Sequence, residues 1–208
     1  MENLNKVQWV YSSQNNQELA ERYDQWAKDY DADLDQDFGW IAPQRVVDFF
    51  SKHVPKDARI LDAGAGTGLA GEILSSLGYG EIVAMDLSQG MLDEAEKKGV
   101  YQEFHRMVMG DTLDFPSDSF GAVITVGVLT VGHAPASSLD ELVRVTRPGG
   151  HIAFSLRPDV YENDGFKEKQ TELESAGKWK VVEVSEPFQA LPVGEPDVFH
   201  QVWVYRVS

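Results

Sequence analysis

The chain has 208 residues, 42% of them hydrophobic, which suits one compact domain with a single core. Its 18 basic and 34 acidic side chains give a formal net charge of −16, which would repel a phosphate backbone and disfavours a nucleic-acid substrate. Cysteine is absent, and no apolar stretch is long enough to cross a membrane or to form a signal-peptide core. We therefore expect no disulfide or thiolate metal site, no membrane partner and a cytoplasmic location.

The N-terminal quarter is expected to form a polar arm followed by two helices. Residues 1–17 are polar, and residues 18–30 carry apolar or aromatic side chains at spacings that share one helical face. These side chains are Leu19, Tyr23, Trp26 and Tyr30. A second helix, bounded by prolines, is predicted over 44–53. We expect residues 18–54 to form a lid over the carboxyl ends of the following strands, where ligands bind in parallel sheets.

Residues 58–208 alternate between strand and helix patterns and are expected to form a Rossmann-like core. Strands are predicted at 58–62, 81–86, 104–109, 120–126 and 151–156, and helices at 69–77, 91–98, 139–145 and 162–176. Ser88 is expected to cap one helix, and Ser138 with Glu141 to form a capping box at the start of another.

The end of the chain departs from this alternation. The strands predicted at 179–184 and 198–207 have no helix between them, so they must pair antiparallel. Residues 1–208 are therefore predicted to form one α/β domain with helices on both faces of a mostly parallel sheet and a C-terminal antiparallel hairpin.

A glycine-rich segment follows the first of these strands. Asp62 is followed by glycines at alternate positions, Gly64, Gly66 and Gly68, and then by a helix whose free N–H groups point at the same place. Residues 66–71 match the G-x-G-x-x-G dinucleotide pattern, but a carboxylate at Asp62 would repel a pyrophosphate. The same carboxylate would attract S-adenosylmethionine, which has a positive amine and sulfonium and no phosphate.

Two further carboxylates follow strands of the predicted sheet. Asp86 ends the second strand, where an acidic side chain can accept hydrogen bonds from ribose hydroxyls of either type of cofactor. Asp111 follows the third strand and can accept a hydrogen bond from an adenine amino group. The backbone N–H of Thr112 or Leu113 would then meet the ring nitrogens.

The order of these motifs resembles that of the class I S-adenosylmethionine-dependent methyltransferases. The resemblance covers roughly residues 40–157, including Met85-Asp-Leu-Ser88 and Arg147-Pro-Gly-Gly150, and implies a seven-stranded sheet with a reversed last strand. The segments 23–31, 127–135 and 167–179 also resemble a narrower group of small members of this family.

The resemblance implies a role for each matching residue. Gly64, Ala65, Gly66 and Gly68 would border the methionine part of the cofactor, and Leu87 and Met91 would pack against the adenine. The Val126 carbonyl would face the cofactor amine, and Tyr23 and Tyr30 would lie in the helix that closes over its carboxylate. Residues 126–129 read Val-Gly-Val-Leu in place of the Asn- or Asp-Pro-Pro-Tyr signature, which disfavours nucleobase and glutamine amino groups as acceptors.

His133 is the candidate general base, because it lies in a glycine-rich loop after the fourth strand; the alternative is an exposed loop histidine. The other histidines form no ligand-spaced cluster, so no metal site is expected.

The sequence thus predicts methyl transfer from S-adenosylmethionine to a small-molecule acceptor, by a monomer or a weak homodimer joined through edge strand 179–184. Three alternatives stay open: a cofactor-binding protein without transferase activity, a protein acceptor, and a nicotinamide-dependent oxidoreductase. The last is disfavoured because no Tyr-x-x-x-Lys pair follows the fourth strand.

Overall fold

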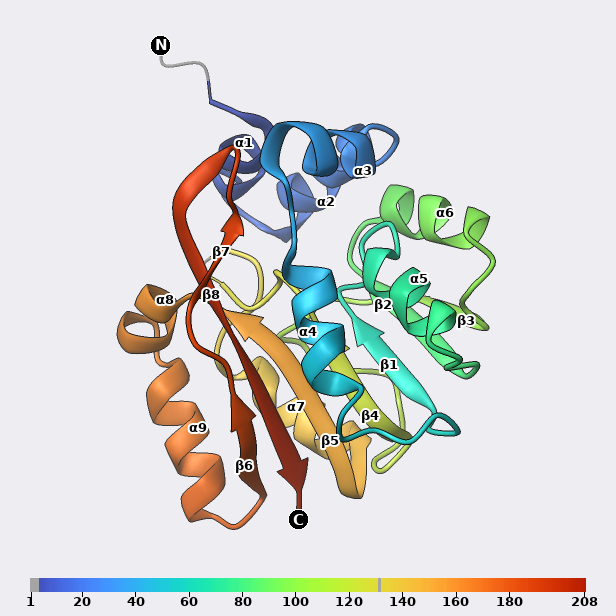
Figure 1. Cartoon of the computed structure of the whole chain (residues 1–208), viewed down its shortest axis with the longest axis vertical. Helices are drawn as coiled ribbons and strands as arrows, with labels where there is room; N and C mark the ends of the chain where they lie inside the picture. The colour runs from blue at the N-terminus through green and yellow to red at the C-terminus, as the bar shows by residue number, and fades with distance from the viewer. Residues whose placement is uncertain (1–3, 131) are drawn as a thin grey trace.

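The protein is built around one sheet with helices on both faces (Figure 1). The computed structural model describes residues 4–130 and 132–208, and within them the sheet has eight strands in the order β3-β2-β1-β4-β5-β8-β6, with β7 paired to β8 outside this path. The strands are β1 (Ile60–Ala63), β2 (Ile82–Asp86), β3 (Glu103–Arg106), β4 (Phe120–Thr125), β5 (Thr146–Leu156), β6 (Trp179–Val184), β7 (Phe188–Leu191) and β8 (Glu195–Val207).

The directions of the strands confirm the predicted fold class. Neighbouring strands from β3 to β5 run parallel, whereas β8 runs antiparallel to both β5 and β6. The strand β7 is additional to the expected seven and pairs antiparallel with β8.

Side chains alternate along the strands between two hydrophobic clusters. From β1, Ile60 belongs to the cluster that includes α4 (Ala42–Phe50), α5 (Leu69–Ser76) and α6 (Gln89–Lys97). Leu61 belongs to the cluster of α7 (Ser138–Val145) and α9 (Phe166–Ser175) on the other face. Figure 1 shows α4 in front of the sheet and α7 behind it. Because both faces are covered, β1, β2 and β4 are buried at every position.

The N-terminal helices form a further layer across the carboxyl ends of the parallel strands, beyond the arrowheads of β1 and β5 in Figure 1. They are α1 (Lys6–Tyr11), α2 (Asn16–Trp26), α3 (Tyr30–Asp33) and the π-helix η1 (Leu34–Phe38). Their side chains share a hydrophobic cluster with Leu191 of β7. The helices up to Phe38 thus lie where the lid was expected, whereas α4, the second expected lid helix, packs on the face of the sheet instead. Movement of the N-terminal helices as a lid stays a prediction. None of the helices in the described part of the chain is long and apolar enough to span a bilayer.

Two predicted helices are interrupted in the structure. The helix expected over 18–30 ends at Trp26, and Tyr30 begins the separate helix α3. The helix expected over 162–176 is divided into α8 (Pro158–Asn163) and α9, because Gly165 between them adopts a left-handed conformation with φ of 80°.

The capping box predicted at Ser138 and Glu141 is wrong. Helix α7 follows Ser137 as its N-cap, and no side-chain hydrogen bond caps it. The Glu141 carboxylate instead accepts two hydrogen bonds from Arg144, each 2.7 Å long, and one from the Leu113 N–H. Charge-assisted pairing of this kind is stronger than a neutral cap and takes the carboxylate away from the helix terminus.

Candidate active site

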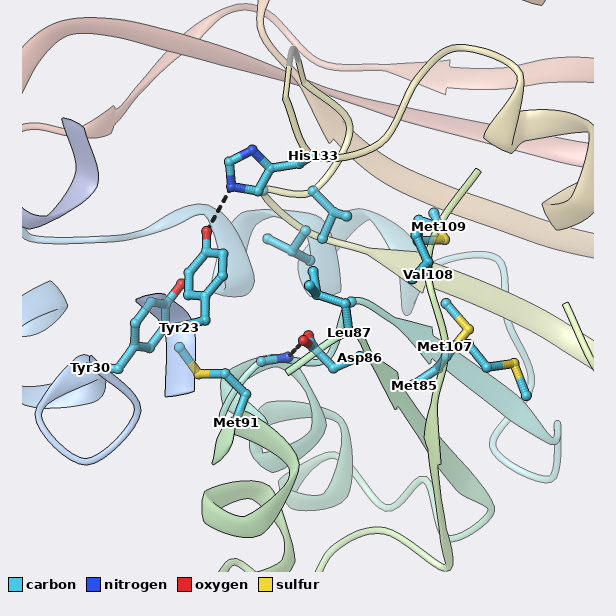
Figure 2. Close-up of a pocket in the computed structure, with 15 residues that line it drawn as sticks. Tyr23, Tyr30, Met85, Asp86, Leu87, Met91, Met107, Val108, Met109 and His133 are labelled. Carbon is cyan, nitrogen blue, oxygen red and sulfur yellow. Dashed lines mark hydrogen bonds between the residues drawn. The ribbon is translucent and has the colours of Figure 1, made fainter. Parts of the chain in front are cut away.

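A cavity opens at the carboxyl ends of β1, β2 and β4, next to the N-terminal helices (Figure 2). The space free of atoms within it, counted together with the open solvent at its mouth, is about 600 Å³. We call it the strand-end cavity. Many of the predicted site residues line it: Tyr23, Tyr30, Gly64, Gly66, Asp86, Leu87, Met91, Val126 and His133.

Two smaller cavities adjoin the strand-end cavity. The first, which we call the glycine-loop cavity, is lined by Asp62 and Ala65, among others. The second, the aromatic cavity, lies between the N-terminal helices and the end of β4. The space free of atoms, open solvent included, is about 340 Å³ in the first and about 390 Å³ in the second. Tyr30 and Val126 line all three cavities, so the three meet at these two residues.

The remaining predicted residues lie outside these three cavities. Asp111 lines an open outer cavity that it shares with His133. Gly68, Thr112 and Leu113 line none of the four, and the Leu113 N–H already donates to Glu141 at 2.8 Å. The adenine contacts of Asp111, Thr112 and Leu113 and the methionine contact of Gly68 therefore stay predictions.

Six residues of the strand-end cavity were not singled out from the sequence. They are Met85, Met107, Val108, Met109, Gly127 and Val128. Each lies within two residues of a predicted one or in the segment directly before Gly110. The signal that could have indicated them is their position at or just after the end of a strand. The sequence predicts residues 107–109 as part of a strand, but β3 ends at Arg106 and these three residues form a loop.

The glycine loop exposes its backbone to the cavity at Gly66. This residue has a left-handed φ of 56°. A Cβ built on Gly66 would meet nothing within 4 Å, so the side of the backbone without a side chain faces the strand-end cavity. A Cβ at Gly64 would instead lie 2.3 Å from Val128 Cγ2, so Gly64 lets the loop after β4 pack against the loop after β1.

Asp86 holds together the loops that follow β1 and β2. Its Oδ2 accepts the Gly66 N–H at 2.8 Å, and its Oδ1 accepts the Ser88 N–H at 2.9 Å (Figure 2 shows the first bond). Burial raises the pKa of this carboxyl, although the N–H donors act in the opposite direction. Each oxygen retains a lone pair, so Asp86 can still accept hydrogen bonds from a ligand in the strand-end cavity.

Asp62 is buried at the end of β1 beside the glycine-loop cavity. Its Oδ2 accepts a hydrogen bond of 2.7 Å from the Tyr101 hydroxyl, a residue that the sequence did not indicate. Burial raises the pKa of the Asp62 carboxyl to about 7, and the tyrosine hydrogen bond partly counteracts this. A cation bound in the cavity would favour the charged form of this carboxyl.

His133 contacts the N-terminal helices. Its Nε2 lies 2.9 Å from the Tyr23 hydroxyl, as the dashed line in Figure 2 shows, and its ring meets the Tyr11 ring edge to face at 4.7 Å. Tyr23 lines both the strand-end and the aromatic cavity, so this hydrogen bond connects His133 to the aromatic cavity through the tyrosine hydroxyl.

The charges around the cavities favour a cationic ligand. No lysine or arginine is among the described residues that line the strand-end, glycine-loop or aromatic cavity, whereas Asp62 and Asp86 are buried beside them. Both carboxylates already accept hydrogen bonds, and a cation nearby would further stabilise their charged forms, whereas an anion would be repelled. The positive amine and sulfonium of S-adenosylmethionine fit this site, and the pyrophosphate of a dinucleotide does not. Within residues 4–130 and 132–208, no group of three or more His, Asp or Glu side chains could hold a metal ion.

Comparison with known proteins identifies the family of the chain. A family profile described as a methyltransferase domain matches residues 61–154. Methyltransferase-like protein 27 of Homo sapiens is 34% identical over 165 residues, which cover 76% of this chain and 66% of that protein. That protein is a member of the narrower group that the sequence resembles, and the similarity over most of the chain confirms that resemblance. The chain spans about half to two thirds of the length of the curated relatives it matches.

Solved structures share the fold at low sequence identity. An S-adenosylmethionine-dependent methyltransferase from Methanosarcina mazei superimposes with a TM-score of 0.62 at 14% identity, covering 76% of this chain and 96% of that one. The (4+2)-cyclase SpnF superimposes with a TM-score of 0.70, also at 14% identity, covering 94% of this chain and 97% of that one.

The fold is that of a Rossmann-like α/β protein with a cavity at its strand ends. The chain belongs to the class I S-adenosylmethionine-dependent methyltransferases, and S-adenosylmethionine is its cofactor.

Proposed function

We propose that this protein transfers the methyl group of S-adenosylmethionine to a small-molecule acceptor. The observation that carries the proposal is the meeting of three cavities at Tyr30 and Val126. The strand-end cavity suits the adenosine, the glycine-loop cavity suits the methionine, and the aromatic cavity remains for an acceptor. The methyl group to be transferred then belongs at the junction.

The cofactor contacts in this proposal follow the predicted residues. Asp86 accepts hydrogen bonds from the ribose hydroxyls, Leu87 and Met91 pack against the adenine, and Asp62 attracts the amine. The lining of the strand-end and glycine-loop cavities by these residues supports the assignment. Asp111 borders only the outer cavity, which supports a contact with the outer edge of the adenine at most.

The protein's own part in the reaction is to orient the acceptor, exclude water and move a proton. When bound, the cofactor supplies a methyl carbon that is already electrophilic, so no covalent enzyme intermediate is needed. Holding an acceptor in line with that carbon can contribute on the order of 7–11 kcal/mol. His133 receives the proton that the acceptor releases, and the Tyr23 hydroxyl relays it to Nε2, as their 2.9 Å contact supports.

A small-molecule acceptor is supported by the lining of the aromatic cavity, most of which comes from the N-terminal helices and is apolar or aromatic. The net charge of −16 also disfavours nucleic acid. A cytoplasmic location and a monomer or weak homodimer, which the sequence favours, belong to the same proposal.

Binding and transfer are tested separately on the pure protein. Isothermal titration should detect uptake of S-adenosylhomocysteine and none of NAD; uptake of NAD alone would overturn the proposal. Incubation with methyl-labelled S-adenosylmethionine and a cell extract should then label the small-molecule fraction.

The distribution of the label also separates the alternatives. Label in the protein fraction would identify a protein acceptor instead. Uptake of S-adenosylhomocysteine without any transfer would indicate a cofactor-binding protein that performs no methylation. The likeness to a protein named as a cyclase is a reason to include this last measurement.

A further inference from the structure

The aromatic cavity has a lining of unusual composition. Five aromatic residues, Tyr11, Tyr23, Trp26, Tyr30 and Trp40, contribute to it, and every other described residue that lines it is apolar or glycine. Tyr30 meets two of the other rings at steep angles, Trp26 at 68° with centroids 4.7 Å apart and Tyr23 at 67° and 6.3 Å, whereas Tyr23 and Trp26 are nearly parallel, at 6° and 6.4 Å. The Trp26 Nε1–H donates to Asp33 Oδ2 at 2.7 Å, which holds the orientation of this indole.

The cavity offers no counter-charge to an anion. None of its described lining residues is a lysine, arginine, aspartate or glutamate. Burial raises the pKa of the Tyr11, Tyr23 and Tyr30 hydroxyls, so these groups are neutral at physiological pH. The guanidinium that acts electrostatically on Tyr11, that of Arg157, is held by Asp159 in two hydrogen bonds of 2.6 and 3.0 Å. A carboxylate or phosphate in this cavity would lose its hydration without gaining a cationic partner.

Binding of a cation is more favourable than binding of an anion in the same cavity. The faces of Trp and Tyr rings attract cations, with about 0.5–1 kcal/mol at exposed sites and about 2 kcal/mol when the cation is desolvated. The net charge of −16 also raises the local concentration of cations around the molecule.

We propose that the aromatic cavity binds the methyl acceptor and that this acceptor is an apolar amine, an inference that rests on the proposed methyltransferase function. The amine nitrogen attacks through its lone pair and forms the new nitrogen–carbon bond. The electrons of the breaking carbon–sulfur bond remain on the sulfur. The positive charge thus moves from the sulfur to the nitrogen, which the aromatic rings would surround. An acceptor that binds as its ammonium first loses a proton through Tyr23 to His133, because only the neutral nitrogen has a lone pair with which to attack.

The test uses three probes with the same tert-butyl-like head and different charge. Choline is the cation, 3,3-dimethylbutan-1-ol is its neutral isostere and 3,3-dimethylbutyrate is the anion. Binding is measured by titration calorimetry on the protein saturated with S-adenosylhomocysteine. We expect choline to bind about 5- to 30-fold more tightly than the alcohol, the range equivalent to about 1–2 kcal/mol of cation–π attraction. The anion should bind most weakly.

A variant and a matched control locate the effect. Tyr11 lines the aromatic cavity, but the residue as a whole is 38% exposed, so Tyr11→Leu removes a ring with little effect on folding. We expect this variant to lose several-fold of the preference for choline. Trp9 lies in the same helix α1 but lines none of the four cavities, so Trp9→Leu should keep the preference.

The outcomes separate this inference from the function on which it rests. Failure to take up S-adenosylhomocysteine overturns both. Normal uptake overturns the amine inference alone if choline binds no better than the alcohol, if the anion binds best, or if none of the probes binds. The inference is also overturned if Tyr11→Leu and Trp9→Leu change the preference equally.

Discussion

The Tyr101 hydroxyl donates a buried hydrogen bond of 2.7 Å to Asp62 Oδ2, across 39 residues of sequence. The same ring occupies the space beside Gly71, where an added Cβ would lie 2.2 Å from the Tyr101 oxygen. Gly71 therefore makes room for a tyrosine that fixes the orientation of Asp62. Tyr101 is thus a positioning residue for the carboxylate expected to attract the cofactor amine.

Replacing Tyr101 by Phe should change the pH dependence of cofactor binding. The Asp62 carboxyl has its pKa raised to about 7 by burial, and the tyrosine hydrogen bond opposes this increase. The affinity for S-adenosylhomocysteine should therefore rise as the pH increases through about 7 in the wild type. In Tyr101→Phe the midpoint should move up by about one pH unit, equivalent to a hydrogen bond of roughly 1.4 kcal/mol.

Titration calorimetry between pH 5.5 and 8.5 measures this shift. Tyr79→Phe is the matched control, because the Tyr79 hydroxyl is also buried but donates to the Val54 carbonyl, at 2.9 Å. Identical profiles for the wild type and both variants would show that Tyr101 does not act through Asp62.

Asp62 should also affect the pH dependence of folding stability. Its pKa is about 7 in the folded protein and about 3.9 in an unfolded chain, so between these values the folded state binds more protons. The contribution of this group to the free energy of unfolding is therefore largest at low pH and falls as the pH rises towards 7. In Asp62→Asn, stability relative to the wild type should increase between pH 5 and pH 7, by up to about 1.4 kcal/mol per pH unit. Urea denaturation at both pH values measures the difference, and a pH-independent difference would contradict the assignment.

Asp86→Ala should weaken cofactor binding by about 1–3 kcal/mol, because it removes an acceptor for the ribose and leaves buried N–H groups without a partner. Those groups belong to Gly66 and Ser88, so thermal stability should fall as well. Titration calorimetry with S-adenosylhomocysteine gives the affinity. Asp93→Ala, an exposed carboxylate of α6, should retain wild-type binding. Wild-type affinity in Asp86→Ala would rule out the ribose contact.

The proton relay predicts that His133→Ala and Tyr23→Phe act as a unit. Either variant should slow single-turnover methyl transfer by about 100-fold, the lower end for general base catalysis, and the double variant should be little slower than either. Cofactor affinity should change less than the rate in His133→Ala. His105→Ala removes a histidine on the edge strand β3 and serves as the control. An unchanged rate in His133→Ala would remove this residue from the mechanism.

The sequence was sufficient to locate the loops of the site. Parallel strands bring their carboxyl ends to one edge of a sheet, so Asp62, Gly66 and Asp86 could be placed together from the strand and glycine pattern alone. The position of Ser88 as a cap was also predictable and is confirmed, since its side chain accepts the Met91 N–H at the start of α6.

Contacts between distant segments could not be predicted in the same way. Tyr101 follows no motif, and its hydrogen bond to Asp62 depends on how the segment before β3 packs over α5. Residues 107–109 have the composition of a strand. The pairing of β3 with β2 ends at Arg106, so these residues form a loop that lines the strand-end cavity. The pairing of Tyr23 with His133, 110 residues apart, depends on where the N-terminal helices dock.

The docking of those helices can be weakened by a single methyl group at Gly90. The Asp24 side chain of α2 accepts hydrogen bonds from the Ser88 hydroxyl at 2.6 Å and from the Gly90 N–H at 2.8 Å. An added Cβ at Gly90 would lie 2.9 Å from the Asp24 Cα, so Gly90→Ala must push α2 away from α6. Within α6 itself, alanine is favoured over glycine by about 1 kcal/mol, so the core should not lose stability.

Hydrogen exchange distinguishes these two effects. In Gly90→Ala the amides of α2 should exchange faster while those of the central strands keep their protection, and S-adenosylhomocysteine should dissociate faster because the enclosing helices open more often. Gly80→Ala is the control, since a Cβ there would meet nothing within 4 Å. If α2 keeps its protection in Gly90→Ala, the Asp24 contact does not hold the N-terminal helices closed, and their role as a lid must depend on other contacts.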